Sequence, residues 1–129
     1  MNHQLRNVRI LAVDDDNDTR EMLRFILQQA GGEVTAVESV DEALESFQTS
    51  PPDVIVSDIG MPESNGYALI SLIREQDEKM GRTTPAIALT AYTSPADEKT
   101  ALASGFQRYI GKPFGPADLI ESIRSLVTK

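Results

Sequence analysis

The sequence predicts an α/β fold in which five parallel strands form one sheet and helices cover both of its faces. Two observations predict it. Short apolar runs alternate along the chain with longer segments whose apolar residues recur at helical spacing. A chain of 129 residues is also long enough for one such domain and too short for two. Five strands with a thin second one suit the doubly wound order 2-1-3-4-5.

The first strand and helix are marked by a sharp change of composition. The apolar run 9–13 ends at consecutive aspartates, and a helix is predicted over 18–30. Asp18 followed by Glu21 indicates a capping box at the beginning of this helix, and a pair of glycines indicates its end. Its apolar residues at helical spacing are Met22, Leu23, Ile26, Leu27 and Ala30.

The middle of the chain repeats this alternation. Residues 33–37 alternate between polar and apolar and predict the second strand, and Ser39 with Glu42 predicts the cap of the next helix. The third strand is predicted over 54–56, and after a loop with proline and glycine a helix is predicted over 67–80. The residues of that helix expected to point inward are Leu69, Leu72, Ile73 and Met80.

Two more pairs of strand and helix complete the pattern. The fourth strand is predicted over 85–89 and the fifth over 106–110. Ser94 is expected to cap a helix that ends at Ser104, and the last helix begins near Pro116. The inward face of the first of these helices is small and consists of Ala96, Ala101, Leu102 and Ala103. The last helix has a regular apolar stripe, formed by Leu119, Ile120, Ile123, Leu126 and Val127.

Composition excludes several classes of function. Twelve basic and 20 acidic residues give a net charge of −8, and the basic residues are scattered, so we expect no direct contact with nucleic acid. The absence of cysteine excludes disulfides, thiolate zinc sites and thiol nucleophiles. The one histidine, His3, lies in a polar tail, so a Ser-His-Asp triad has no base. Without a membrane-length apolar stretch or a signal peptide, we expect a cytoplasmic protein with no membrane partner.

The organisation of the chain is expected to be simple. Residues 1–7 predict a flexible N-terminal tail, and residues 8–129 predict one domain. The chain ends two residues after its last apolar position, so we expect no room for an output domain. We find no internal repeat and no low-complexity segment in the sequence.

Reactive side chains follow four of the predicted strands. Asp14, Asp15 and Asp16 come directly after the first, Asp58 after the third, Thr90 after the fourth and Lys112 after the fifth; these six are the candidate site residues. In open parallel sheets, ligands bind beyond the carboxyl ends of the strands, where the strand order reverses. We therefore expect side chains that are far apart in the sequence to meet at one edge of the sheet.

Carboxylates, a hydroxyl and an ammonium group at one place suit phosphoryl transfer. Adjacent carboxylates repel one another unless a cation lies between them. Hard oxygen ligands with further partners from outside favour Mg²⁺ as the cofactor. A metal ion, a lysine and a threonine can surround the oxygens of a phosphoryl group during in-line transfer. One carboxylate then remains as a nucleophile and forms an aspartyl phosphate.

With these residues in place, the sequence resembles the receiver domain of response regulators in two-component signalling. The resemblance covers about residues 9–127 and rests on several motifs in order. The motifs are Asp14-Asp15, Asp58-Ile-Gly-Met61-Pro62 with Gly66, Leu89-Thr90-Ala91, Tyr109 and Lys112-Pro113-Phe114. Each motif is weak alone, and their order and spacing make the resemblance specific. It implies a flavodoxin-like arrangement of five strand–helix units.

The resemblance implies a role for each acidic residue of the site. Asp58 is expected to accept a phosphoryl group from a phosphohistidine on a sensor histidine kinase or a histidine phosphotransfer protein. Asp14 and Asp15, together with Asp58 and the backbone carbonyl of Gly60, are expected to hold Mg²⁺. Asp16 is expected to be solvated rather than a third ligand. The resemblance implies a signalling module that mediates its own phosphoryl transfer and dephosphorylation, and not an enzyme.

The resemblance also implies a switch. Lys112 is expected to pair with the phosphoryl group, and its bond to Pro113 is expected to be cis. Thr90 is expected to bond the same group, and Tyr109 to turn from exposed to buried. The helix over 94–104 is expected to move most, because its small inward residues give it little packing energy. The downstream protein, a phosphorylation-dependent dimer and an origin in a hybrid histidine kinase are left open.

Two alternatives remain at this stage. The aspartates resemble the nucleophile motif of haloacid-dehalogenase-type phosphatases, although Asp18 stands where that motif has threonine or valine and a later acidic metal pair is missing. A non-phosphorylated pseudo-receiver that serves as a docking module is the other alternative. The complete set of candidate residues argues against it.

Overall fold

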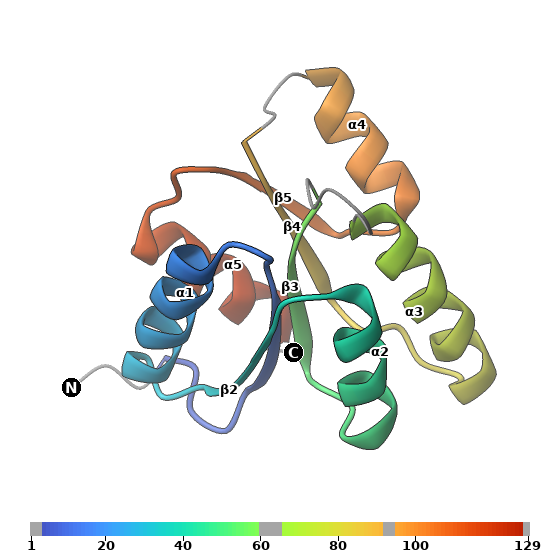
Figure 1. The fold of residues 1–129 in the computed structure, drawn as a ribbon, viewed down its shortest axis with the longest axis horizontal. Coiled ribbons are helices and arrows are strands. Elements are labelled where there is room, and N and C mark those ends of the chain that lie inside the picture. Colours follow the sequence, from blue (N-terminus) through green and yellow to red (C-terminus); the bar gives the residue numbers. More distant parts are fainter. Residues whose placement is uncertain (1–3, 60–65, 92–94, 128–129) are drawn as a thin grey trace.

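The chain folds as one five-stranded sheet flanked by helices (Figure 1). The computed structural model describes residues 4–59, 66–91 and 95–127. The strands are β1 (Arg9–Val13), β2 (Glu33–Val37), β3 (Val54–Asp58), β4 (Ala86–Thr90) and β5 (Arg108–Gly111). They pair in parallel in the order β2-β1-β3-β4-β5. The predicted doubly wound fold is confirmed.

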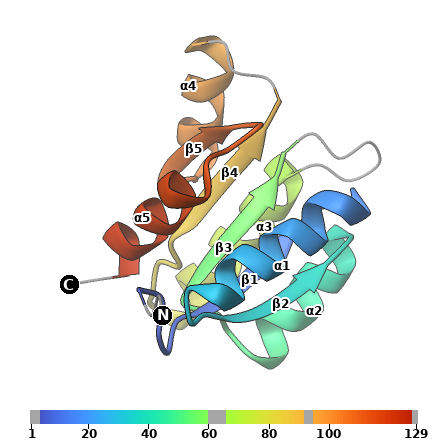
Figure 2. The same ribbon diagram turned by 90° about the vertical axis from the view of Figure 1, so that its left-hand side faces the viewer.

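Helices cover both faces of the sheet (Figures 1 and 2). They are α1 (Asn17–Gln29), α2 (Val40–Thr49), α3 (Gly66–Met80), α4 (Pro95–Ser104) and α5 (Pro116–Val127). Helices α1 and α5 lie on one face, and α2 and α3 lie on the other, with α4 beside α3 (Figure 2). Among the helices of the described ranges, none combines the length and the apolar character needed to cross a membrane.

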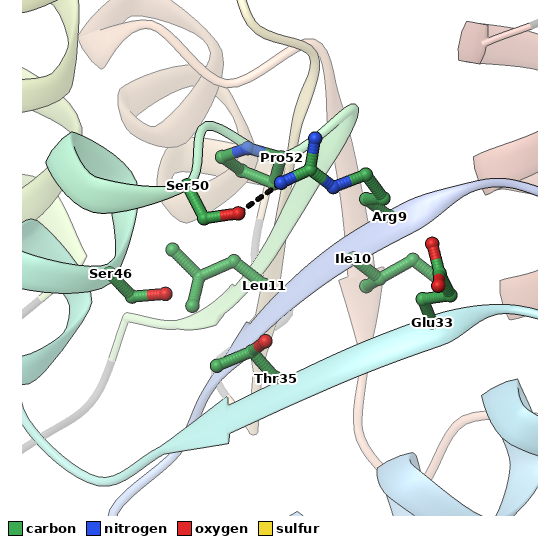
Figure 3. A pocket seen from close by; sticks show the side chains of 8 residues that line it. All are labelled: Arg9, Ile10, Leu11, Glu33, Thr35, Ser46, Ser50 and Pro52. Carbon is green, nitrogen blue, oxygen red and sulfur yellow. Dashed lines mark hydrogen bonds between the residues drawn. The ribbon is translucent and has the colours of Figure 1, made fainter.

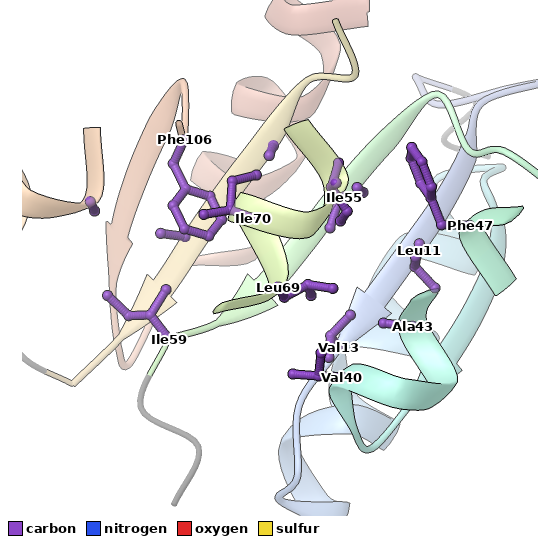
Figure 4. Packing of buried hydrophobic residues seen from close by; sticks show 14 residues of the cluster. Leu11, Val13, Val40, Ala43, Phe47, Ile55, Ile59, Leu69, Ile70 and Phe106 are labelled. Atoms are coloured by element: carbon purple, nitrogen blue, oxygen red, sulfur yellow. The ribbon is translucent and has the colours of Figure 1, made fainter. Parts of the chain in front are cut away.

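The sheet separates two apolar clusters because successive strand residues point to opposite faces. The cluster under α2, α3 and α4 is shown in Figure 4, and its larger side chains are Leu11, Val13, Phe47, Ile55, Leu69, Ile70, Ile73 and Phe106. The cluster under α1 and α5 includes Ile10, Leu23, Leu27, Val56, Ile87, Leu89, Leu119 and Ile123. Strands β3 and β4 are buried along their whole length, as expected for the centre of a parallel sheet.

The predicted inward face of α3 is partly wrong, and one residue of the apolar pattern of α1 is exposed. Met22 is 51% exposed, Leu72 is 38% exposed and Met80 is 50% exposed, whereas Ile70 is buried instead. Several apolar residues lie at helical spacing on each helix, and the sequence pattern alone does not select which of the overlapping stripes faces the sheet. The stripe predicted for α5 is confirmed, since Leu119, Ile120 and Ile123 are buried and Leu126 and Val127 are half-buried.

The helix caps follow the sequence in one case and depart from it in another. Ser39 caps α2 as predicted, and its hydroxyl accepts a hydrogen bond from the backbone N–H of Glu42. The predicted cap of α1 at Asp18 is wrong. Asp16 caps α1, because its carboxylate accepts hydrogen bonds from both the backbone N–H and the hydroxyl of Thr19.

The segment before β1 contributes to the core. Residues 4–7 form a turn in which Leu5 is fully buried against the cluster under α1 and α5. The backbone N–H of Leu5 donates a hydrogen bond of 2.8 Å to the carbonyl of Ala30, at the end of α1. This part of the predicted flexible tail is therefore packed against the domain.

Helix α4 is held by few apolar contacts. Of the four inward residues predicted for it, Ala101 is buried, while Ala96, Leu102 and Ala103 are exposed, so most of that prediction is wrong. Ser94, the predicted cap, lies outside the described residues. A helix that buries one small side chain gains little from packing, so α4 is the helix with the weakest apolar attachment among those described.

A polar network joins the end of α3 to the amino edge of the sheet. The guanidinium of Arg74 donates hydrogen bonds to the carbonyls of Gly105 and Thr84 and pairs with Asp77 at 2.8 Å. Asp77 is 2% exposed and also accepts from the N–H and the hydroxyl of Thr84. Gly105 has a φ of +123°, and a Cβ there would lie 3.2 Å from the Arg74 side chain, so this position requires glycine.

The Arg74→Ala substitution is expected to lower the free energy of unfolding by about 2–3 kcal/mol, because it leaves the buried Asp77 carboxylate and two carbonyls short of partners. Urea denaturation measures this loss. The matched control is Arg124→Ala, whose exposed pair with Glu121 is expected to contribute less than about 0.5 kcal/mol. Equal losses in the two variants would contradict a structural role for the network.

Candidate functional site

The carboxyl edge of the sheet brings the candidate residues together. Asp14 follows β1, Asp58 ends β3, Thr90 ends β4 and Lys112 follows β5. Because β1, β3, β4 and β5 are successive neighbours in the sheet, these four ends are adjacent. The Lys112 Nζ lies 2.9 Å from Asp14 Oδ2 and 3.6 Å from Asp58 Oδ2, across 98 residues of sequence in the case of Asp14. The expected convergence is observed for the side chains of Asp14, Asp58 and Lys112, and Thr90 joins them through its backbone carbonyl, which accepts from the N–H of Lys112.

Three carboxylates form the centre of this edge. Asp14, Asp15 and Asp58 each present an oxygen, and these oxygens lie within 4.8 Å of one another. Asp14 is fully buried, Asp58 is 7% exposed and Asp15 is exposed, so the group is open to solvent on one side. Gly60, whose carbonyl was expected to join them, lies outside the described residues, as do Met61 and Pro62.

The charges of the group are out of balance. Three carboxylates against the one ammonium of Lys112 leave a net charge of −2 when all are ionised. Burial raises the pKa of Asp14, and the charge of Asp58 adds to this, although the N–H of Asp16 and the Lys112 ammonium stabilise its ionised form. This residual charge and the hard oxygen donors fit a divalent cation such as Mg²⁺.

Lys112 is positioned by both its backbone and its side chain. Its N–H donates a hydrogen bond of 2.7 Å to the carbonyl of Thr90, and its bond to Pro113 is cis, as predicted. Burial alone would lower the pKa of Lys112, but the neighbouring Asp14 and Asp58 carboxylates raise it above its ordinary value. The lysine is therefore a fixed cation at the edge of the carboxylate group.

Thr90 ends β4 at this edge, and Tyr109 lies on β5, the strand that packs against α4. Thr90 is fully buried at the end of β4, and Tyr109 on β5 is half-buried against the cluster under α2, α3 and α4. Burial raises the pKa of Tyr109, and the carboxylate of Asp97 in the first turn of α4 raises it further. Tyr109 is therefore within electrostatic reach of the first turn of α4, and the switch roles of Thr90 and Tyr109 stay predictions.

Two residues that shape the site were not assigned this role from the sequence. Asp16 donates its backbone N–H to Asp14 Oδ1 at 2.9 Å, and Arg20 donates to the backbone carbonyl of Asp14 at 3.0 Å. A cation in the first turn of a helix is disfavoured by the helix dipole, so Arg20 at that place was a signal that a specific partner holds it. The sequence contained that signal, but not the identity of the partner.

A separate cavity lies at the opposite edge of the sheet (Figure 3). It has a volume of about 290 Å³ and lies at the amino end of β1, where the guanidinium of Arg9 donates a hydrogen bond to the hydroxyl of Ser50. Thr35 and Ser46 also line it. Since Arg9 begins the strand that Asp14 follows, this cavity is not part of the carboxylate group.

The chain is similar to known sequences over most of its length. The profile of the response regulator receiver domain matches residues 10–124. An uncharacterized 14.6 kDa protein in the sodA1 3′ region of Leptolyngbya boryana is 45% identical over 120 residues, which are 93% of this chain and 90% of that protein. The probable transcriptional regulator ycf27 of Cyanophora paradoxa is 35% identical over 126 residues, which are 98% of this chain and 51% of ycf27. This chain thus spans about half the length of ycf27.

A comparison with solved structures gives the same family. The receiver domain of the Francisella response regulator 1452 superposes with a TM-score of 0.85 at 31% sequence identity. The match covers 94% of this chain and 97% of that domain. Sequence and structure therefore agree on a receiver domain over nearly all of the chain.

The Asp14→Asn substitution is expected to raise the free energy of unfolding at pH 7 in metal-free buffer by about 1 kcal/mol, a usual size for a stabilising substitution. The pKa of Asp14 is raised in the folded state, so its protonated form favours folding. That contribution is complete below the unfolded pKa of 3.8 and is lost as the pH rises through the folded pKa. The advantage of asparagine should therefore vanish near pH 3.8.

Thermal unfolding between pH 3.5 and pH 7, about the window in which carboxyl groups titrate, measures this difference. Glu45→Gln removes an exposed charge from the middle of α2 and serves as the control, with little expected change at any pH. A lower stability of Asp14→Asn at pH 7 would show that the ion pair with Lys112 outweighs burial and repulsion at Asp14.

Proposed function

Since the chain belongs to the response regulator receiver domain family, we propose that it accepts a phosphoryl group on Asp58 in a Mg²⁺-dependent step and thereby changes its affinity for partner proteins. The observation that carries the proposal is the Lys112 ammonium, 2.9 Å from Asp14 and 3.6 Å from Asp58 at the edge of a three-carboxylate group. The donor of the phosphoryl group is a phosphohistidine on a sensor histidine kinase or a histidine phosphotransfer protein.

The proposed reaction is a nucleophilic displacement at phosphorus. A carboxylate oxygen of Asp58 forms a bond to phosphorus while the bond from phosphorus to the histidine ring nitrogen breaks, and the leaving imidazole takes a proton from solvent. Asp58 is largely buried, and its carboxylate lies in a group with Asp14 and with Asp15, which is exposed. The product is one aspartyl phosphate per chain, which suits a signalling module.

The chain offers ligands and charge for the transferred group. Asp14, Asp15 and Asp58 would hold Mg²⁺, which neutralises charge on the phosphoryl oxygens when bound. Lys112 already lies beside Asp58 and would pair with a phosphoryl oxygen as a point charge. With the group in place, the ammonium exchanges part of its contact with Asp14 for a contact with phosphate.

The proposed response to phosphorylation runs through Thr90 and Tyr109 to α4. Thr90 lies beside Lys112 at the end of β4. Tyr109 lies on β5, which packs against α4, and the Asp97 carboxylate in the first turn of α4 contributes to the raised pKa of Tyr109. Helix α4 buries only Ala101, so its displacement disrupts few apolar contacts. Weak packing of α4 and its nearness to Tyr109 support α4 as the part that changes partner affinity.

The Asp58→Asn substitution is expected to reduce phosphoryl incorporation from radiolabelled acetyl phosphate or a phosphorylated kinase to background, because an amide is no nucleophile for phosphorus. The control is Asp18→Asn, an exposed acid in the first turn of α1 that should leave labelling unchanged. Incorporation that survives in Asp58→Asn would place the acceptor elsewhere. Repeated release of phosphate from small phosphate esters would favour a phosphatase instead.

The Thr90→Val substitution is expected to keep phosphorylation of Asp58 and to uncouple it from α4, since valine preserves shape and removes the hydroxyl. Amide hydrogen exchange of α4, with and without beryllofluoride as a phosphoryl mimic, measures the coupling. The native chain should show a large change in α4, Thr90→Val little change, and Thr35→Val on β2 the native change. A native response in Thr90→Val would remove Thr90 from the switch.

A further inference from the structure

Arg20 contacts the loop that presents the carboxylate group. It lies in the first turn of α1, and its side chain is 15% exposed. One guanidinium nitrogen donates to the carbonyl of Asp14 at 3.0 Å, and the other donates to Asn17 Oδ1 at 2.8 Å. The same group lies 4.0 Å from the carboxylate of Glu38 in the turn after β2. Arg20 thus ties the loop after β1 to its own helix and to a neighbouring turn.

These contacts fix the peptide group from which Asp15 projects. The carbonyl of Asp14 belongs to the peptide that joins Asp14 to Asp15, and Arg20 holds it from outside. From the other side, the N–H of Asp16 donates to the Asp14 carboxylate, and Asp16 caps α1. The backbone on both sides of Asp15 is therefore held, although the Asp15 side chain is exposed.

The positive charge of Arg20 disfavours metal binding, whereas its hydrogen bonds to the loop favour it. A guanidinium that contacts the loop presenting the carboxylates repels an incoming divalent cation, so its electrostatic effect alone is to weaken metal binding. Its hydrogen bonds hold the loop in the form that places the oxygens of Asp14, Asp15 and Asp58 within 4.8 Å of one another. The two effects predict opposite results when Arg20 is removed, which makes its role measurable.

We propose that Arg20 is a positioning residue that holds the Asp14–Asp15 peptide in the arrangement that binds Mg²⁺. This inference rests on the proposed function, in which the three carboxylates hold the metal. In this proposal Arg20 does not touch the metal. It contributes to the metal affinity through its hydrogen bond to the carbonyl of Asp14.

The test is a calorimetric titration of the metal-free protein with Mg²⁺, using MgCl₂ as the probe. Arg20→Ala is expected to weaken Mg²⁺ binding roughly tenfold, as loss of a group that orients a metal ligand commonly does. Arg20→Lys keeps the charge and loses the two-pronged contact, so it should weaken binding by about threefold. The control Arg24→Ala removes the same charge one turn further along α1, where its partner is Glu21, and should leave binding unchanged.

Two further measurements separate positioning from a general loss of structure. In metal-free protein, the amide of Asp16 should exchange faster in Arg20→Ala than in the native chain, while the amides of β3 should keep their protection. At saturating Mg²⁺, labelling by acetyl phosphate should stay within about twofold of the native rate, because the nucleophile and Lys112 are untouched. If Arg20→Ala lowers the affinity for Mg²⁺ but keeps the labelling rate at saturating Mg²⁺, Arg20 acts by positioning.

Equal or tighter Mg²⁺ binding in Arg20→Ala would overturn the inference, because the guanidinium would then act through charge alone. Should Arg20→Ala fail to fold, Arg20→Lys decides the question, and native Mg²⁺ affinity in that variant would overturn the inference equally. Neither result affects the proposed function. Failure of the native chain to bind Mg²⁺ and to be labelled at Asp58 would overturn the proposed function itself.

Discussion

The candidate site is defined by a charge imbalance at the carboxyl edge of the sheet. The Lys112 ammonium joins Asp14 and Asp58 across the ends of four adjacent strands, and it neutralises only part of their charge together with that of Asp15. A buried carboxylate with a raised pKa costs stability at neutral pH. This cost supports our proposal that a cation and a phosphoryl group use the site.

The sheet supplies the rigidity that such a site requires. Strands β3 and β4 are buried throughout, and each ends with a residue of the site, Asp58 and Thr90. Side chains at the ends of buried strands are held by the backbone hydrogen bonds of the sheet, so small displacements there are resisted. Helix α4, which buries only Ala101, is the contrasting element. A rigid site and a weakly packed helix suit our proposal that phosphorylation of the site displaces α4.

Much of the fold and the grouping of the site could be predicted because both depend on patterns that are local in the sequence. Apolar runs located the strands, and parallel pairing places the residues after them at one edge. The cap of α1 was misplaced because Asp16 and Asp18 both suit a helix beginning, and the sequence does not show that Thr19 donates both of its hydrogen bonds to Asp16. The roles of Arg20 and Arg74 were missed because their partners include backbone carbonyls, which every residue has and which no sequence pattern marks.

Arg20 and Arg74 hold segments at opposite edges of the sheet. Arg20 holds the loop at the carboxyl edge, and Arg74 holds Gly105, where α4 ends at the amino edge. The far end of α4 is therefore held by hydrogen bonds to Gly105, while Asp97 in its first turn contributes to the raised pKa of Tyr109. A helix fixed at one end and lightly packed along its length can move most at the other end. The displacement of α4 that we propose would then pivot about Gly105 and be largest beside the phosphorylated edge.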